Sequence, residues 1–439
     1  MILLICAAGV VIGFQLALTA LTLIGLAAAI VGLRRPALGL FGIGMLCTMD
    51  AIMGPLLLSG GLLRWNTLNY WLLIVIVLSL PFLLRLSDIH TRLLQLFVLL
   101  LSLQLAISAN PVLGVQTTVA AAILFGVLVY FARACHDEQS WYWLGLIDGL
   151  LGAAGGLVFY LQKDHLPYVN PNNWSYFPLT AIFSICLALP FAHKRRRGQL
   201  YLMLLAIINV AWVFLSASRG DLLIAVCCLL FLVLLMRGLS NKLVFVISAL
   251  LIGLLISTQF ADLQEHTLSR IDLLVNPAYS DRMRTSGRSD LILGGWYIFR
   301  DHPFGVGTGG YASSWATIDY DENLSGYRRG QAFPAHAGWI KTLAENGIVG
   351  ITLLISYVLS FTIAAWRTHD RNLRLLGLLM TLIFSLAFIS IEFQWGKGIW
   401  FMAAGMTTLL HREDILFHLS GSAKRTPIRN IIRPRRAAP

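Results

Sequence analysis

The polar stretch at residues 260–345 decides how this chain folds, because it interrupts a sequence made almost entirely of apolar runs. Its most distinctive parts read SDRMRTSGRSD at residues 280–290, HPFGVGTGGY at residues 302–311 and AHAG at residues 335–338. Apolar runs of about 20 residues are long enough to cross a bilayer as helices. The chain is therefore predicted to be a bundle of membrane helices that carries one large polar loop.

The composition favours the same fold class. Hydrophobic residues make up 57% of the 439 residues and charged residues only 12%, against about 25% charged residues in soluble domains. In a soluble protein the net charge of +12 would favour a nucleic-acid partner. In a membrane protein, basic loops meet anionic lipid instead, so membrane lipids are the expected partners and no nucleic acid is expected.

Two further classes of feature are not predicted. The six cysteines lie in or beside apolar runs and outside residues 260–345, so neither a disulfide framework nor a zinc cluster is indicated in the polar stretch. The opening residues, MILLI, contain no basic residue, which argues against a cleaved signal peptide.

We predict an all-α polytopic integral membrane protein with about 12 transmembrane helices, within a range of about 12 to 14. The range arises because the first apolar run is long enough for one tilted crossing or for a short hairpin. The candidate spans are residues 2–33, 36–58, 68–84, 92–109, 112–131, 141–161, 176–192, 199–217, 221–236, 243–259, 338–365, 374–391 and 396–410.

Basic residues assign the two sides of the membrane, because Lys and Arg collect in cytoplasmic loops. The cluster KRRR at residues 194–197 and the basic tail are placed in the cytoplasm, and alternation of the spans places most other basic loops with them. These are the loops that carry Arg34, Arg35, Arg85, Arg92, Arg133, Arg237, Lys242, Arg367, Arg371, Arg374 and Arg412. The large polar loop then faces the extracytoplasmic side of the membrane.

The chain divides into four predicted regions. They are an N-terminal transmembrane bundle (1–259), a large extracytoplasmic loop with short helices and the candidate site (260–337), C-terminal transmembrane helices (338–412) and a basic cytoplasmic tail (413–439). No internal repeat is evident, which disfavours a transporter, because many transporters are built from repeated halves.

Arg219 lies where positive charge is unusual. It follows a span within SASRGD, residues 216–221, on the side of the membrane that basic residues avoid. An arginine at a helix end also commonly extends to the membrane surface without a further role. Its side of the membrane favours a functional role.

Arg288 lies near the start of a helix predicted over residues 291–299, with Ser286 as the N-cap. A cation in the first turn opposes the helix dipole but helps to hold an anion beside the unpaired backbone N–H groups. Arg282 and Arg284 add positive charge nearby. The alternative is that these arginines are solvated and paired with the neighbouring aspartates.

The glycine-rich run at residues 302–311 could cradle an anion with its backbone N–H groups, and Gly305 and Gly307 are the candidates. No strand precedes the run and no Gly-Lys-Ser/Thr follows it, so nucleotide-binding motifs are not matched. A tight turn without ligand contact is the competing interpretation.

His336 begins the last polar segment, at the start of a helix predicted to reach Gly347. A lone histidine is commonly structural, but this one lies at the predicted outer mouth near two arginine-bearing segments. An imidazole is mostly neutral near pH 7 and can accept a proton. Trp339 and other aromatic residues of the loop could stack on sugars, although aromatic residues also collect at membrane interfaces.

Two acidic features complete the candidates. The stretch at residues 319–322, DYDE, superficially resembles a metal-binding Asp-x-Asp, but the arginines that follow it in an irregular loop argue against converging oxygen ligands. Glu392 lies between the last two spans beside Lys397, where it could orient an arginine or form a surface ion pair. No metal and no cofactor are predicted.

These motifs, in this order, resemble the bacterial O-antigen ligase family. That family belongs to a superfamily that also contains O-antigen polymerases and protein O-oligosaccharyltransferases. The resemblance rests on SRG at residues 218–220, GR at 287–288, PFGVG at 303–307, His336 and ENGIVG at 345–350. It covers roughly residues 200–350, and the upstream spans match in hydropathy alone.

The resemblance implies a glycosyltransferase that moves O-antigen from undecaprenyl diphosphate to lipid A–core at the periplasmic face, without a metal and with inversion. It implies that Arg219 and Arg288 bind the diphosphate and that His336 is the general base. Contacts to the diphosphate are an alternative role for His336. The sequence leaves open a polymerase or protein transferase with the same donor, and, in another class, a transporter of the lipid-linked glycan.

Overall fold

The computed structural model describes the chain in separate ranges, and every structural statement below refers to them. They are residues 89–115, 117–118, 121, 138–162, 171–192, 196–216, 218–236, 239–259, 265, 267–269, 271–273, 276, 278–280, 287–317, 333–390 and 401–409. Within these ranges the regular elements are helices, with no strand among them. The predicted all-α class is confirmed for this part of the chain.

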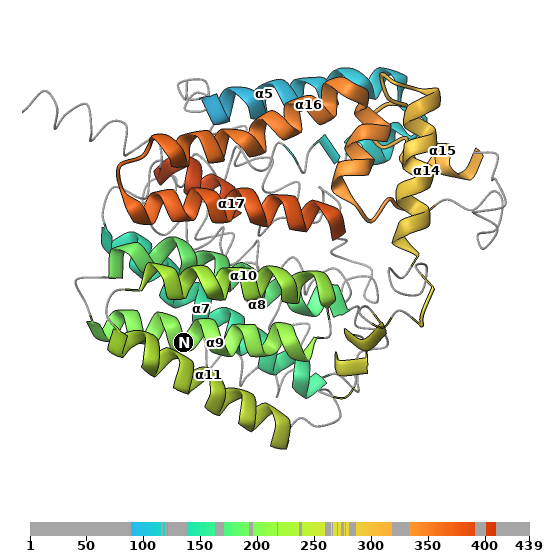
Figure 1. The fold of residues 1–439 in the computed structure, drawn as a ribbon. Coiled ribbons are helices and arrows are strands. Elements are labelled where there is room, and N and C mark those ends of the chain that lie inside the picture. The colour runs from blue at the N-terminus through green and yellow to red at the C-terminus, as the bar shows by residue number, and fades with distance from the viewer. Residues whose placement is uncertain are drawn as a thin grey trace, which may run out of the picture.

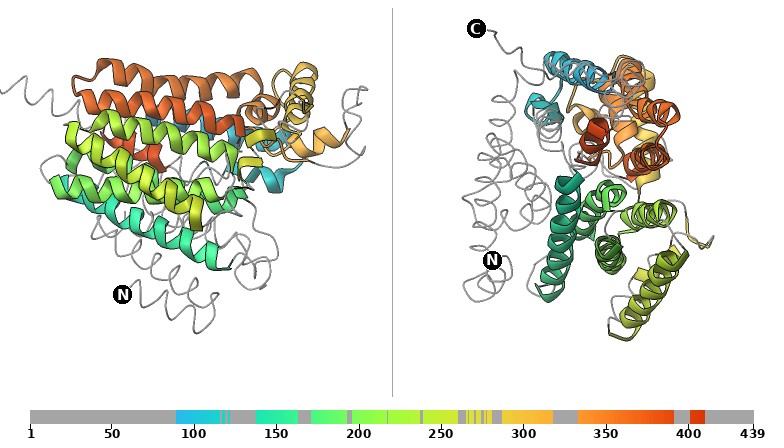
Figure 2. Two further views of the ribbon diagram at one scale, coloured as in Figure 1. Left: turned by 60° about the horizontal axis from the view of Figure 1, so that its bottom comes forward. Right: turned by 90° about the vertical axis from the view of Figure 1, so that its left-hand side faces the viewer.

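The long helices form two groups that run side by side (Figure 1). The first group consists of five helices that follow one another in the sequence and pack as neighbours: α7 (Glu138–Gln162), α8 (Pro171–Ala188), α9 (Arg196–Leu215), α10 (Arg219–Leu235) and α11 (Leu239–Gln259). The second group brings together distant parts of the chain: α5 (Ile89–Leu103), α16 (Gly338–Arg367) and α17 (Arg371–Ser390). Helices α10 and α17 contact each other and join the groups, as the nearly end-on view of Figure 2 shows.

Small residues allow the closest approach in the first group. Gly145 of α7 faces Ala188 of α8, and Gly152 lies directly against the side chain of Asn209 of α9, so a Cβ at either glycine would overlap its neighbour. Small residues at helix interfaces let membrane helices pack backbone to backbone. This explains why α7, with many glycines and few large side chains on that face, contacts both α8 and α9.

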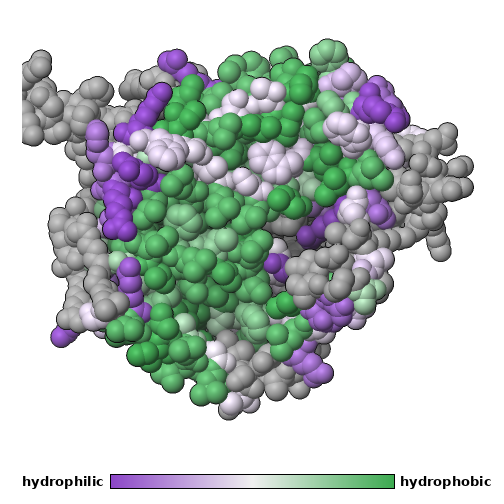
Figure 3. Space-filling view, viewed as in Figure 1, coloured by the Kyte–Doolittle hydropathy of each residue, from purple (hydrophilic) through white to green (hydrophobic). Residues whose placement is uncertain are grey.

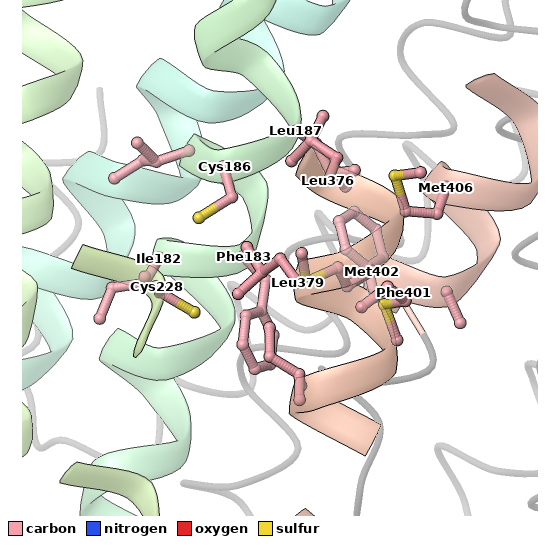
Figure 4. Packing of buried hydrophobic residues seen from close by; sticks show 14 of the residues in the cluster. Ile182, Phe183, Cys186, Leu187, Cys228, Leu376, Leu379, Phe401, Met402 and Met406 are labelled. Carbon is pink, nitrogen blue, oxygen red and sulfur yellow. The ribbon is translucent and has the colours of Figure 1, made fainter. Parts of the chain in front are cut away.

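The two groups share one apolar core. Phe183 and Leu187 of α8 meet Leu376 and Leu379 of α17, and the segment at residues 401–409 adds further side chains (Figure 4). These side chains are at most 1% exposed, and burying a large apolar side chain contributes roughly 1.5–3 kcal/mol in water-soluble proteins. In a bilayer, close packing contributes more to helix association than removal from water does.

Four described helical segments are long and apolar enough to cross a membrane: Ile89–Ile107, Arg197–Leu215, Gly338–Arg367 and Arg371–Ile389. A broad hydrophobic surface covers the middle of the molecule, with hydrophilic residues gathered at the two ends of the helices (Figure 3). The chain is therefore a membrane protein. The total of about 12 spans stays a prediction, because residues 1–88 lie outside the described part of the chain.

Basic residues gather at one end of the bundle. The short connections between α10 and α11 and between α16 and α17 lie at that end, as do the beginnings of α5 and α9. The basic residues described there are Arg92, Arg197, Lys242, Arg367, Arg371 and Arg374. We call this the basic end, and we call the other the loop end.

The loop end carries two short helices, α14 (Arg288–Asp301) and α15 (Tyr311–Thr317). Helix α14 lies across the ends of the long helices rather than along them (Figure 1). Its buried face packs on α15 and on the first turns of α16, where Gly294 meets the ring of Trp315 and Gly295 meets Ile340. The predicted short helices of the loop are thereby confirmed, whereas the four-region division and the periplasmic side stay predictions.

Candidate active site

Arg219 is the first residue of α10, directly after the N-cap residue Ser218. Only the two residues at 216–217 separate the end of α9 from that cap, and Ser216 closes the turn by donating from Oγ to the carbonyl of Val213 at 2.6 Å. Arg219 is half-buried. The predicted position of Arg219 at the end of a helix, away from the basic end, is confirmed.

Asp221 is a buried carboxyl group two residues after Arg219, and only 2% of its surface is exposed. Its Oδ2 accepts a hydrogen bond from the hydroxyl of Ser218 at 2.7 Å and a second, short one from the hydroxyl of Ser175 on α8. A carboxylate in the first turn is also favoured by the helix dipole. Asp221 therefore ties the beginning of α10 to the beginning of α8.

Arg288 is the first residue of α14, and the prediction that it lies in the first helical turn is confirmed. The predicted N-cap is wrong: the cap is Gly287, in the left-handed region with φ 78°, rather than Ser286. Glycine adopts this conformation without the steric penalty of a side chain. The helix also begins three residues earlier than the 291–299 predicted.

Arg288 and Asp221 both lie at the loop end. Burial raises the pKa of the Asp221 carboxyl group, and the hydrogen bonds from Ser175 and Ser218 and the positive charge of Arg288 lower it by smaller amounts. Because Asp221 is in the same helical turn as Arg219, the two predicted arginines belong to one region. The fold thus joins two segments that are almost seventy residues apart in the sequence.

His336 joins the same end through its two neighbours. Ala335 and Ala337 are at most 2% exposed and lie in one apolar cluster with Leu291 and Ile298 of α14. Leu291 is one turn after Arg288 on the same helix. His336 itself is exposed, so its imidazole is accessible at the loop end.

The backbone of His336 is in an unusual conformation. Its φ is 49°, and it is the one described residue other than glycine with a positive φ. Such a conformation costs about 1–3 kcal/mol and persists where the surrounding structure enforces it. The predicted helix starts slightly later than expected, because Ala337 is the N-cap and Gly338 is its first residue.

The glycine-rich run is built into the helix that follows His336. The N–H of Val306 donates to the carbonyl of Ala344 at 3.0 Å, and the N–H of Gly307 donates to that of Glu345 at 2.9 Å. The N–H of Gly305 donates to His302 at 2.8 Å. These backbone donors are already paired within the protein. Contact of Gly305 and Gly307 with substrate stays a prediction, and the geometry assigns them a structural role.

The glycine-rich run packs against a kink in α16. Gly347 has φ 62° and ψ −159° inside the helix, so the helical backbone breaks there and then continues as α16. The predicted break at Gly347 is confirmed, although the chain resumes a helix after it. The freed N–H of Ile348 donates to Pro303 at 3.0 Å.

Two side chains connect the kink to other elements through hydrogen bonds. Asn346 donates to Thr308 at 3.1 Å and to Gln104 of η1 (Gln104–Ile107), and Thr308 donates to Leu101 of α5 at 2.9 Å. Glu345 accepts the N–H of Tyr311 at 3.2 Å. The ENG sequence therefore organises the loop end by bonding to three separate segments.

Trp339 lies in the first turn of α16 and faces α17. Its Nε1 donates to the carbonyl of Ser385 at 3.3 Å, and its ring packs edge-on against Phe388 at 5.6 Å between centroids. The side chain is half-buried. Stacking of Trp339 on a sugar stays a prediction, since the indole N–H already has an acceptor.

The remaining predicted candidates lie outside the described residues. These are Arg282, Arg284, Glu392 and the acidic stretch at residues 319–322. Within the described ranges, no three His, Cys, Asp or Glu side chains are grouped so that they could hold a metal ion. Metal-independence stays a prediction.

A comparison with known proteins finds a match over the part of the chain that contains these site residues. Residues 202–355 match the family model described as O-antigen ligase. This segment, about a third of the chain, is similar to the O-antigen ligase family. The resemblance read from the sequence is thereby confirmed. The matched segment runs from α9 into α16 and includes Arg219, Arg288 and His336, while no curated protein matches the chain.

The family segment also contains buried charged residues to which the sequence assigned no role. Asp221 follows the SRG motif directly, but its partner Ser175 lies forty-six residues away on α8, outside the match. Lys341 and Glu345 are four residues apart on α16 and are 4% and 1% exposed. Two charged residues four positions apart in a predicted helix lie on the same face, which was a readable signal.

Proposed function

We propose that this protein is an O-antigen ligase of the bacterial inner membrane, with its active site at the loop end facing the periplasm. It would transfer O-antigen polysaccharide from undecaprenyl diphosphate to a sugar hydroxyl of lipid A–core. The family match supports a role in the ligase and polymerase superfamily, whose substrates are lipid-linked polysaccharides. The gathering of basic residues at the opposite end supports the orientation, because that end would be cytoplasmic.

One observation carries the proposal. Arg288 acts on Asp221 beside Arg219, while the helix that begins with Arg288 packs on the two alanines that flank His336. Two guanidinium groups and an accessible imidazole thus come from three segments to one end of the bundle. The strained backbone of His336 agrees with a functional role, since such conformations concentrate at active sites.

In the proposed reaction Arg219 and Arg288 bind the donor diphosphate. A guanidinium group stays charged and pairs with phosphate oxygens through two parallel hydrogen bonds. When the bond between the anomeric carbon and the phosphate oxygen breaks, negative charge accumulates on the departing diphosphate. Fixed cations in a partly buried site stabilise that charge in the transition state.

His336 accepts the proton of the acceptor hydroxyl. The hydroxyl oxygen forms a bond to the anomeric carbon from the face opposite the diphosphate, so the configuration inverts. The proton passes to the imidazole, and undecaprenyl diphosphate leaves with the bonding electron pair. General-base catalysis of this kind typically contributes about 10²–10⁴-fold.

Transfer by the purified protein in lipid discs tests the proposal. The donor is an undecaprenyl-diphosphate-linked glycan, and the acceptors, supplied separately, are lipid A–core, a second donor molecule and an acceptor peptide, each with and without EDTA. We expect product with lipid A–core and no effect of EDTA. Product with the second donor alone would identify a polymerase, and product with the peptide alone a protein transferase.

If the protein binds the lipid-linked glycan but transfers it to none of the acceptors, the result would contradict an enzymatic function. It would favour a transporter of the lipid-linked glycan. A transporter site commonly places ionisable residues near the middle of the membrane. Here the arginines proposed to bind the diphosphate begin their helices at the loop end. That placement favours the transferase.

A further inference from the structure

We propose that Phe304 anchors the loop end to the bilayer by inserting its ring at the boundary between the lipid headgroups and the acyl chains. The partner is the lipid surface itself, whatever reaction the protein catalyses. The Phe304 side chain is 71% exposed. Single exposed apolar side chains are common and mean little by themselves, so the position of Phe304 in the fold decides its role.

The backbone of Phe304 is held where two long helical segments end. Its carbonyl oxygen accepts a hydrogen bond from Nε2 of Gln104, in η1, at 3.1 Å. A Cβ at Gly347 would overlap the backbone of Phe304, so the kink of α16 lies directly against it. The N–H of Ile348 donates to the carbonyl of Pro303 at 3.0 Å. Phe304 therefore contacts both the α5–η1 segment and the kink of α16.

Helix α16 presents an exposed apolar stripe that runs from this kink to the basic end. Its members recur at spacings that fall on one face of a helix. In chain order they are Ile348, Ile355, Leu359, Ile363 and Trp366. About 27 Å separates the first from the last at 1.5 Å per residue, close to the roughly 30 Å of a hydrocarbon core. The stripe thus has the length of one bilayer crossing, and Phe304 lies at its loop end.

The segment Ile89–Ile107 repeats this pattern beside α16. Helix α5 packs along α16 (Figure 1). Its segment carries exposed apolar side chains at the same kind of spacing, namely Ile89, Leu96, Leu99, Leu103 and Ile107. Gln104, which bonds to Phe304, lies between the last two. Both stripes therefore end beside Phe304, and its side chain continues the surface that the two helices present to lipid.

Charged residues directly precede Phe304. Arg300 and Asp301 form an exposed ion pair at 3.1 Å, and the guanidinium of Arg300 lies 5.2 Å from the centroid of the Tyr297 ring. Interfacial segments keep their charged side chains among the headgroups and bury apolar ones about 5–10 Å into the boundary with the acyl chains. The change from charged to apolar side chains between Asp301 and Phe304 matches that boundary and favours lipid as the partner.

The anchor would set the level of α14 relative to the bilayer. Helix α14 ends at Asp301, three residues before Phe304, and lies across the ends of the long helices (Figure 1). After Phe304, the N–H groups of Val306 and Gly307 bond to α16. With Phe304 inserted, α14 is kept along the bilayer surface at the level of the headgroups.

Photo-crosslinking in discs of palmitoyl-oleoyl phosphatidylcholine tests the proposal. Benzoylphenylalanine, a photoreactive analogue of phenylalanine, replaces Phe304, Ile355 or Thr317 of the full chain. Ile355 belongs to the stripe of α16, whereas Thr317 is exposed at the end of α15, which points away from the bundle (Figures 1 and 2). We expect lipid adducts at position 304 in a yield close to that at 355 and several-fold above that at 317.

Two results would overturn the anchor. A lipid yield at position 304 as low as at 317, with adducts at 355, would mean that Phe304 faces water. Crosslinks from position 304 to a second copy of the chain, in place of lipid, would mean that the exposed ring belongs to a protein interface.

A second measurement needs no unnatural residue. Phe304→Leu should keep the wild-type unfolding temperature in the same discs, whereas Phe304→Asp should lower it by several degrees, because a charge at the acyl boundary is unfavourable. His302→Asp, at the neighbouring exposed histidine, is the control and should have no effect. Equal unfolding temperatures for Phe304→Asp and Phe304→Leu would also overturn the anchor. Neither measurement depends on transfer activity, so the anchor and the proposed function are tested separately.

Discussion

The chain contains two buried aspartates that look alike locally and differ in their neighbours. Asp148 and Asp221 are each at most 2% exposed, and each accepts a hydrogen bond from a serine of α8. The two serines, Ser184 and Ser175, are nine residues apart, or about 13 Å along a helix. Arg288 acts on Asp221, whereas Asp148 is surrounded by the helices α7, α8 and α9.

The comparison shows that burial of an acid does not by itself mark a site. A polar residue inside a membrane bundle can stabilise helix packing through one hydrogen bond, by about 0.6 kcal/mol on average in a measured case. Asn209 does this on α9 by donating to Gly149 of α7 at 3.0 Å. At the loop end, the nearby cation and the short connection between α9 and α10 separate the proposed active site from such packing contacts.

The largest effect is expected for His336→Ala at the loop end. Loss of a general base should lower turnover by about 10²–10⁴-fold and leave donor binding intact. The assay compares transfer rate with binding of the lipid-linked glycan to the same preparation. His302→Ala is the control, because His302 is also exposed in the polar loop. An equal loss of binding and turnover in the His336 variant would reassign it to the diphosphate.

Arg219→Lys should have the next largest effect. Lysine keeps the charge but loses the paired hydrogen bonds to phosphate oxygens. A charge-assisted hydrogen bond contributes about 1.5–3 kcal/mol, so kcat/KM should fall by roughly 10- to 100-fold. Arg197→Lys, on an exposed arginine at the basic end, should have no effect. A wild-type kcat/KM in the Arg219→Lys variant would show that Arg219 does not bind phosphate oxygens through paired hydrogen bonds.

A substitution in the glycine-rich run should reduce stability rather than donor affinity. A Cβ at Gly305 would overlap the carbonyl of Glu345, and its φ of 91° suits no other residue well. Gly305→Ala should therefore destabilise the fold by about 1–3 kcal/mol, measured as a lower unfolding temperature. Gly253→Ala on α11, which has open space around it, should be neutral or slightly stabilising. Unchanged stability with weaker donor binding would instead support an anion cradle.

The smallest effect on turnover is expected for Asp148→Asn. The variant keeps a hydrogen-bonding side chain in the interior of the first group of helices, so transfer should stay at the wild-type rate. Thermal unfolding and transfer are measured together on one preparation. A loss of turnover without a loss of stability would show that Asp148 affects the reaction at the loop end. The two aspartates would then not differ in the way proposed.

Hydropathy and charge predicted the helical class and the positions of Arg219, Arg288 and His336 well. Each of these residues lies at the boundary of a helix, and such boundaries are visible where an apolar run begins or ends. The break at Gly347 was predictable for the same reason, because glycine favours a left-handed backbone.

Contacts between distant segments were not predictable from one sequence. Nothing near Asp221 indicates that Ser175 donates to it, because that contact depends on how α8 and α10 pack. The N-cap of α14 was misassigned to Ser286 because serine is the commoner cap, whereas the turn requires the left-handed backbone of Gly287. The glycine-rich run suggested a ligand cradle, but the carbonyls of Ala344 and Glu345 occupy its donors.

The most direct test is a cryo-EM structure of the protein in lipid discs with a non-hydrolysable undecaprenyl diphosphate glycan. We expect the diphosphate at the beginnings of α10 and α14, within hydrogen-bond distance of Arg219 and Arg288, with the anomeric carbon facing His336. A diphosphate bound at the basic end, or at the loop end without contact to either arginine, would contradict the proposed active site.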